Sequence, residues 1–123
     1  MLLNNEMDAM WLPEPQATTA RLYKHRVITS SEKTKEQLGV IAFRTDMLQT
    51  QNRKKQLQAF IKAYNNAVDS LNTYGLSHYS ELVTKYCHTD EKTVKAIPKV
   101  TFKHATAPLE KDIQKAKAFI PKL

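Results

Sequence analysis

The chain has 123 residues, of which 41% are hydrophobic and 25% charged, and this length and composition suit one small globular domain. Only two glycines occur, which argues against an all-β fold, because such folds use glycine at their many turns. The formal net charge of +7 disfavours a protein that mimics DNA and favours phosphate polyanions, acidic protein patches or anionic lipid as partners.

The sequence predicts a cytoplasmic protein. No apolar run approaches the roughly 20 residues that cross a bilayer, so we expect no membrane partner. Glu6 and Asp8 interrupt the apolar N-terminus, and no basic segment precedes it, so it is not predicted to be a signal peptide. The single cysteine, Cys87, excludes an internal disulfide. A phage or plasmid gene, expressed in a host cytosol, fits the same features.

Residues 1–20 are predicted to form an N-terminal arm, and residues 21–123 a single helical domain. The arm is acidic and contains neither lysine nor arginine. Pro13 and Pro15 stop any helix there. The apolar residues before them are expected to dock on the core as one turn: Met7, Met10, Trp11 and Leu12.

Two segments have the composition of short strands. Residues 21–29 are rich in β-formers, and residues 99–104 alternate lysine and threonine with Val100 and Phe102. We expect these segments to pair as a two-stranded β-ribbon beside a mainly α-helical bundle.

Residues 32–73 have the periodicity of a helix, in two apolar stripes that are out of register. The first stripe comprises Leu38, Ile41, Thr45 and Leu48, and the second comprises Leu57, Phe60, Ile61, Tyr64, Val68 and Leu71. Eight polar residues at 49–56 separate them, so either one long helix changes its buried face or a loop joins two helices. No proline or glycine marks a break at that point, which favours one long helix that ends at Gly75 in a left-handed conformation.

The segment 78–97 has the pattern of a helix-turn-helix. A first short helix is predicted to begin near Ser77 and end near Cys87, and a second to be capped by Thr89 and stopped by Pro98. The second helix would direct Lys92, Thr93, Lys95 and Lys99 outward.

Two features count against groove reading by this segment. Its turn contains no glycine, and Asp90 and Glu91 would repel phosphate at the start of the second helix. The alternative is a pair of ordinary packed helices. A last helix is predicted to begin near Thr106, with Pro108 in its first turn, and to end at Pro121.

Cations gather in two blocks, which we predict to converge on one phosphate-binding face. The predicted nucleic-acid-binding residues are Lys92, Thr93, Lys95, Lys99, Lys103, Arg53, Lys54 and Lys55. No zinc-ligand spacing, glycine-rich phosphate loop or catalytic motif occurs. We therefore expect no metal, no cofactor and no enzymatic activity.

The favoured hypothesis is a small protein that binds DNA or RNA through the phosphate backbone, either as a regulator of transcription or replication or within a ribonucleoprotein. The alternative is a helical interaction factor (an inhibitor, adaptor or assembly subunit) that binds an acidic protein surface. In that case the apolar residues of 38–71 would form part of a partner or homodimer interface.

Overall fold

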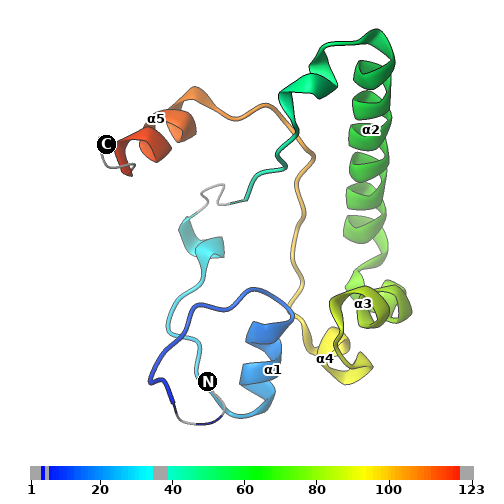
Figure 1. Cartoon of the computed structure of the whole chain (residues 1–123). Coiled ribbons are helices and arrows are strands. Elements are labelled where there is room, and N and C mark those ends of the chain that lie inside the picture. The colour runs from blue at the N-terminus through cyan, green and yellow to red at the C-terminus, as the bar shows by residue number, and fades with distance from the viewer. Residues whose placement is uncertain (1–3, 5, 35–38, 120–123) are drawn as a thin grey trace. The chain divides into compact units, whose positions relative to one another are not determined.

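The computed structural model describes residue 4, residues 6–34 and residues 39–119, and the regular structure within these ranges is helical (Figure 1). The α-helices are α1 (Gln16–Leu22), α2 (Gln51–Tyr74), α3 (Ser80–Cys87), α4 (Glu91–Ala96) and α5 (Glu110–Phe119). Short 3-10 helices occur at η2 (Ser31–Thr34), η3 (Thr45–Leu48) and η4 (Leu76–Tyr79). The predicted mainly α-helical class is confirmed.

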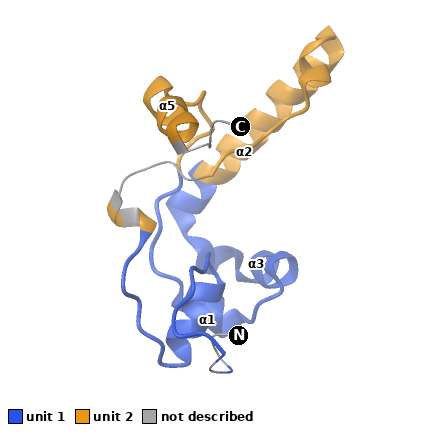
Figure 2. Cartoon of the chain, turned by 60° about the vertical axis from the view of Figure 1, so that its left-hand side comes forward, with its two compact units in different colours: residues 1–30, 69–102 blue, residues 31–68, 103–123 orange. Residues whose placement is uncertain are grey.

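The chain divides into two compact units (Figure 2). Unit 1 comprises residues 1–30 and 69–102, and unit 2 comprises residues 31–68 and 103–123. Each unit therefore combines segments that are distant in sequence, and α2 contributes residues to both. The expected end of the arm at residue 20 falls inside α1, a helix with buried side chains.

Unit 1 is built around α1, α3 and α4. Its most buried side chains lie on the two helices that pack together, α1 and α4: Thr18, Ala20, Thr93 and Val94. Arg21, in the last turn of α1, donates to the Thr18 hydroxyl at 2.8 Å and to the Ala96 carbonyl at 3.1 Å. Because the last carbonyls of a helix have no partner within it, Arg21 both satisfies the end of α4 and ties it to α1.

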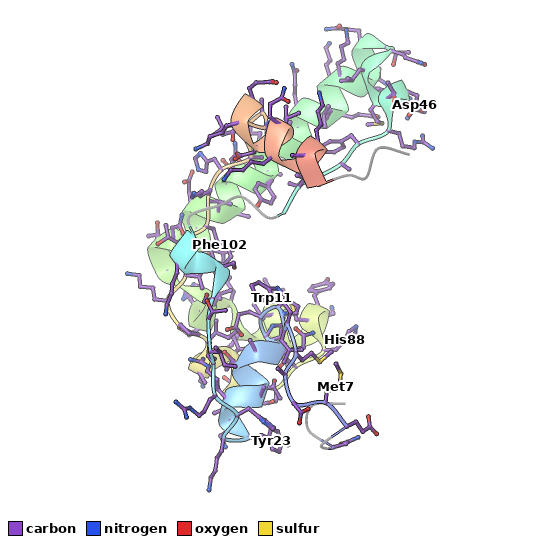
Figure 3. All side chains as sticks on the ribbon, turned by 90° about the vertical axis from the view of Figure 1, so that its left-hand side faces the viewer. Met7, Trp11, Tyr23, Asp46, His88 and Phe102 are labelled. Carbon is purple, nitrogen blue, oxygen red and sulfur yellow. The ribbon has the colours of Figure 1, made fainter. Side chains whose placement is uncertain are left out.

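The apolar residues of the N-terminal segment do not form the docked turn expected from the sequence. Residues 7–13 have no regular structure, and the side chains of Met10 and Trp11 are 44% and 67% exposed. Figure 3 labels Met7 and Trp11 within this segment. Pro15 is buried and precedes the first residue of α1, so the prolines mark the start of a helix. The carboxylate of Glu14 accepts the Thr18 N–H at 3.0 Å and satisfies one free donor of that first turn.

The expected β-ribbon is absent from residues 21–29 and 99–104, both of which the structure describes in full. Arg21 and Leu22 complete α1, which ends with Lys24 in the left-handed region at φ 68°. The Lys24 N–H bonds the Arg21 carbonyl at 2.9 Å, and the His25 N–H bonds the Ala20 carbonyl at 3.1 Å. These two hydrogen bonds form a Schellman motif, and they occupy backbone N–H and carbonyl groups that would have to pair with the other segment in a β-ribbon.

Asparagine side chains of α2 are hydrogen-bonded to the backbone of the second expected strand and the residue after it. Phe102 donates its N–H to Asn72 Oδ1 and accepts from Asn72 Nδ2, both at 2.9 Å, and the Ala105 N–H bonds Asn65 Oδ1 at 2.8 Å. Asn65 and Asn72 lie on one face of α2, about 10 Å apart along its axis, the span of three extended residues. The segment is thus held extended against α2 without joining a sheet.

The predicted pair of short helices is present, with a different cap. α3 ends at Cys87 as expected, and His88 supplies the left-handed residue of the turn at φ 50°, ψ 47°. The cap of α4 is Asp90 and not Thr89: its carboxylate accepts the Thr93 N–H at 2.8 Å and the Thr93 hydroxyl at 2.7 Å. Ile97, before Pro98, is extended, as the proline requires.

The single helix favoured for residues 32–73 begins only at Gln51. Residues 39–44 have no regular structure, and Leu38 lies outside the described residues. The Thr50 hydroxyl accepts the Arg53 N–H at 3.3 Å and so caps the N-terminus of α2. This helix start lies within the polar run 49–56 and was not predicted. Gly75 ends α2 with φ 80° and ψ 162°, a positive φ as predicted but outside the left-handed helical region.

Unit 2 contains most of α2, the segment that precedes it, and α5. Phe43 approaches the ring of Phe60 edge-on, with centroids 5.6 Å apart and planes at 80°. Phe43 therefore contacts α2 from a segment without regular structure and not from the same helix.

α5 begins at Glu110, and the Leu109 carbonyl accepts the Asp112 and Ile113 N–H groups. The predicted start near Thr106, with Pro108 in the first turn, is wrong, because residues 101–109 have no regular structure. The predicted end at Pro121 lies outside the described residues.

Candidate nucleic-acid interface

The first two thirds of α2 form the most uniformly basic surface of unit 2. From residue 47 to residue 68 the chain has no aspartate or glutamate, and its charged residues are Arg53, Lys54, Lys55 and Lys62. All four side chains are exposed. Three of them lie near the N-terminal end of the helix, where the macrodipole is already positive and the first turn contains no acidic residue.

The three consecutive cations do not share a face. Successive helical residues are about 100° apart, so Arg53, Lys54 and Lys55 point to different sides of the helix. Lys55 shares a face instead with Lys62, two turns later. Steps of three, four, three and four residues place five exposed residues in one line, which we name the basic stripe: Asn52, Lys55, Ala59, Lys62 and Asn66.

Prediction from the sequence missed most of this stripe, although the signal was present. The helical spacing that predicts the apolar face of α2 also relates its polar residues. Lys55 and Lys62 are seven residues apart, and this spacing places them on one face of the helix. Asn52 and Asn66 extend the stripe with amides, which bind phosphate and base edges in nucleic-acid complexes.

Arg53 is engaged by neighbouring groups. Its guanidinium lies 3.9 Å from the Asp46 carboxylate and 3.4 Å from the Met47 sulfur. Arg44 pairs with the same carboxylate at 2.9 Å. Lys54, Lys55 and Lys62, in contrast, have no ion-pair partner among the residues that the structure describes. The lysines are therefore the cations that are available to an external anion.

The predicted residues of α4 are arranged differently from the expectation. Thr93 is 1% exposed and its hydroxyl bonds Asp90, so the prediction that it points outward is wrong. Lys95 is exposed but pairs with Glu91 at 2.8 Å, whereas Lys92 is exposed without such a partner within the described chain. Because its N–H and its hydroxyl both bond the Asp90 carboxylate, Thr93 faces Asp90 and the core instead of solvent.

The predicted cations are divided between the two units. Lys92, Lys95 and Lys99 belong to unit 1, and Lys103 belongs to unit 2 together with Arg53, Lys54 and Lys55. Lys99 and Lys103 are exposed. Their convergence on one face stays a prediction.

Two carboxylates at the start of α4 have altered acidity. Hydrogen bonds from the Thr93 hydroxyl and the Thr93 N–H lower the pKa of Asp90. The hydrogen bond and the charge of Lys95 lower the pKa of Glu91. Both groups are therefore ionised at neutral pH and place negative charge at the N-terminal end of α4. In a groove-reading helix, this is the end that contacts the base edges.

The cap gives α4 a specific pH dependence. Because folding lowers the pKa of Asp90 from 3.8, the carboxylate stabilises the folded state above that value, and this stabilisation is lost as the pH falls through the folded-state pKa. We expect the Thr93 amide resonance to report loss of the cap below about pH 4. The variant Asp90→Asn keeps a capping oxygen that does not titrate, so its Thr93 resonance should change far less. An equal acid transition in both proteins would contradict the assignment.

Other kinds of site find no support in the described ranges. These residues contain no group of three or more histidine, cysteine, aspartate or glutamate side chains that could hold a metal ion. Cys87 is exposed at the end of α3. No helix in the same ranges has both the length and the apolar character needed to cross a bilayer.

The chain matches no protein-family model, and no curated protein or solved structure shows significant similarity to it.

Proposed function

We propose that this protein binds nucleic acid through the phosphate backbone, principally by the basic stripe of α2 and the adjacent Lys54. The observation that carries the proposal is the exposed basic stripe of α2 within an acid-free run of sequence from residue 47 to residue 68. Its lysines have no ion-pair partner among the residues that the structure describes, and they lie on the half of a 24-residue helix that includes the positive end of the dipole. Phosphate is the anion that such a surface complements best.

Lys55 and Lys62 are spaced for contacts along a polyanion. They lie about 10 Å apart on one face, with the small side chain of Ala59 between them. A side chain this small lets a phosphate backbone approach the helix closely, and the flanking amides of Asn52 and Asn66 are donors for further phosphate oxygens. This geometry favours positioning on the backbone over recognition of a sequence.

The contribution of unit 1 is proposed to be secondary. The pair α3 and α4 has the order and the short turn of a helix-turn-helix, but α4 has only six residues. Its first turn is acidic, and its central residues Thr93 and Val94 are buried. We assign to this unit only supporting backbone contacts from Lys92 and Lys99.

A titration across salt concentration tests the proposal. The full chain should bind unrelated duplexes of about 20 base pairs with similar affinity, and log K should fall linearly with log[salt], with a slope of about −0.9 for each phosphate neutralised. Fluorescence anisotropy with labelled duplexes measures both quantities. Absence of binding at about 50 mM salt would overturn the proposal, since electrostatic binding is strongest there.

A second function is favoured by a separate observation in unit 2. Five large apolar side chains remain between 37% and 54% exposed: Ile41, Phe43, Leu48, Phe60 and Tyr64. Scattered exposed apolar residues are ordinary, but Phe43 and Phe60 touch each other and form a continuous aromatic surface. The alternative function is thus a helical interaction factor that uses this aromatic surface to bind a partner protein or a second copy.

The change Phe60→Lys tests this alternative. Removing one ring and adding a charge should weaken any association through the aromatic surface by tenfold or more, about the effect of losing one interface anchor. Sedimentation equilibrium measures self-association, and a pull-down measures a complex with another protein. Gln58→Lys, at an exposed polar position of the same helix, is the matched control. Equal association by both variants would exclude this surface as the interface.

A further inference from the structure

The N-terminal segment, residues 6–12, exposes apolar side chains that neither proposed function uses. Met7, Met10 and Trp11 are 39%, 44% and 67% exposed, although methionine and tryptophan are usually largely buried. Both residue types are enriched at protein interfaces, and tryptophan is a frequent anchor there. The three residues have the spacing of one helix face, whereas residues 7–13 have no regular structure. The segment therefore has the pattern of a peptide that becomes ordered on a partner.

The C-terminal end of this segment is fixed to α1. The Pro13 carbonyl accepts the Ala17 N–H at 2.9 Å, and the Glu14 carboxylate accepts the Thr18 N–H at 3.0 Å. Thr18 is itself fully buried. Pro13 also restricts Leu12 to extended conformations. Because one end is held in place, ordering the segment on a partner costs less entropy than ordering a free peptide.

The N-terminal segment is acidic, whereas unit 2 is basic. Residues 1–20 contain three carboxylates and neither lysine nor arginine. Residues 39–68 contain five cations and the single carboxylate of Asp46. Two chains with a net charge of +7 repel each other, so an association between copies is favoured where portions of opposite charge meet. The N-terminal segment of one copy therefore complements unit 2 of another.

The aromatic surface of unit 2 has the matching chemistry. Phe43 and Phe60 meet edge-on and remain 42% and 49% exposed. Arg53 lies seven residues before Phe60 and so shares its face of α2. The Asp46 carboxylate is shared between Arg44 and Arg53, and one carboxylate offsets only one of two guanidinium charges. The aromatic surface therefore has a positive edge.

We propose that the N-terminal segment of one copy docks on the aromatic surface of a second copy. The three apolar side chains of the segment would pack against Phe43 and Phe60, and the Asp8 carboxylate would face Arg53. Within one chain both sets of apolar side chains remain exposed, so each is available to a second copy. This docking depends on the second function proposed above, and it supplies the partner of that surface.

Docking leaves the basic stripe of α2 accessible. Successive helical residues are about 100° apart, so Lys55 and Lys62 lie about 140° and 160° around the helix from Phe60. A docked segment and a phosphate backbone would therefore occupy different faces of α2. Self-association and nucleic-acid binding are thus compatible, and each can be tested without the other.

The fluorescence of Trp11, the only tryptophan of the chain, tests the proposal. The emission of the natural chain should shift to shorter wavelength as its concentration rises from about 1 μM to about 1 mM, because docking moves the indole from water to an apolar surface. Phe60→Lys should abolish the shift, whereas Gln58→Lys, at an exposed polar position, should retain it. The absence of a shift, or a shift that does not depend on concentration and so reports docking within one chain, would overturn the proposal.

A mixture of two variants tests whether the segment and the surface come from different copies. Trp11→Ser keeps the aromatic surface but has no tryptophan, and Phe60→Lys keeps the segment. Adding Trp11→Ser to Phe60→Lys should shift the emission of Trp11, whereas adding a chain with both changes should not. No shift on mixing, or an equal shift with the doubly changed chain, would contradict docking between copies.

Sedimentation equilibrium separates failure of this docking from failure of the aromatic surface. Trp11→Ser should weaken self-association by at least about tenfold, the effect of losing one interface anchor. Tyr23→Ser removes another exposed ring of unit 1, which is 68% exposed, and should leave self-association unchanged. Self-association that survives Trp11→Ser but not Phe60→Lys would overturn this docking and retain the second function. Self-association that survives both changes would exclude the docking and the aromatic surface together.

Discussion

Reversing the charge of three lysines of α2, with Lys54→Glu, Lys55→Glu and Lys62→Glu together, is expected to lower duplex affinity by at least about 100-fold at low salt. Each lysine that contacts a phosphate releases counterions, so its loss should also reduce the salt slope by about 0.9. The measurement is anisotropy across salt concentration, with helix content checked by circular dichroism. Acidic residues near the start of α2 complement its dipole, so loss of binding would not result from loss of the helix.

The control is a second triple with the same change in net charge outside α2: Lys85→Glu, Lys111→Glu and Lys117→Glu. These side chains are exposed on α3 and α5. Because they act only through the long-range field, the control should bind more weakly than the natural chain but keep its salt slope. If both triples lose affinity and slope equally, the basic stripe is not the contact surface.

Placing a carboxylate in the core of unit 1, by Val94→Asp, is expected to unfold the packing of α1, α3 and α4. Val94 is 1% exposed, and an unpaired charge buried there costs several kcal/mol, a large part of the 5–15 kcal/mol that stabilises a typical small domain. Urea denaturation followed by circular dichroism should show a lower midpoint and less helix before the transition.

Val40→Asp is the matched control for this substitution. It makes the same chemical change at a position that is 78% exposed, where water solvates the new charge. We expect the shift of its urea midpoint to be several-fold smaller than the shift caused by Val94→Asp. Surface substitutions typically alter the free energy of unfolding by about 0.5 kcal/mol or less. Similar effects of the two changes would show that Val94 is not a core residue.

Local signals predicted the helices that they directly encode. Gly75 follows the last residue of α2, and Pro98 follows Ile97, which is extended. The end of α3 at Cys87 is also predicted by its local pattern. These elements depend on interactions between residues at most four positions apart, which a sequence displays directly.

The failed predictions involve partners that local patterns do not contain. The backbone groups of Phe102 are bonded to Asn72, 30 residues away, so the alternating pattern of 99–104 does not become a strand. The predicted outward direction of Thr93 is wrong because its hydroxyl bonds the Asp90 carboxylate in the cap of α4. The charges of the α2 lysines are evident in the sequence, but their availability depends on which carboxylates fold near them, and no described residue forms an ion pair with Lys54, Lys55 or Lys62.

Asn65 and Asn72 also make the ordering of α2 a cooperative process. Asparagine is a poor helix former, so these two residues weaken the helix when it stands alone. Their hydrogen bonds to residues 102 and 105 exist only after the later segment has been positioned. The segment in turn has no regular pairing of its own and depends on the helix for partners. Neither part is fully stable by itself, so a fragment ending before residue 102 should have a frayed α2.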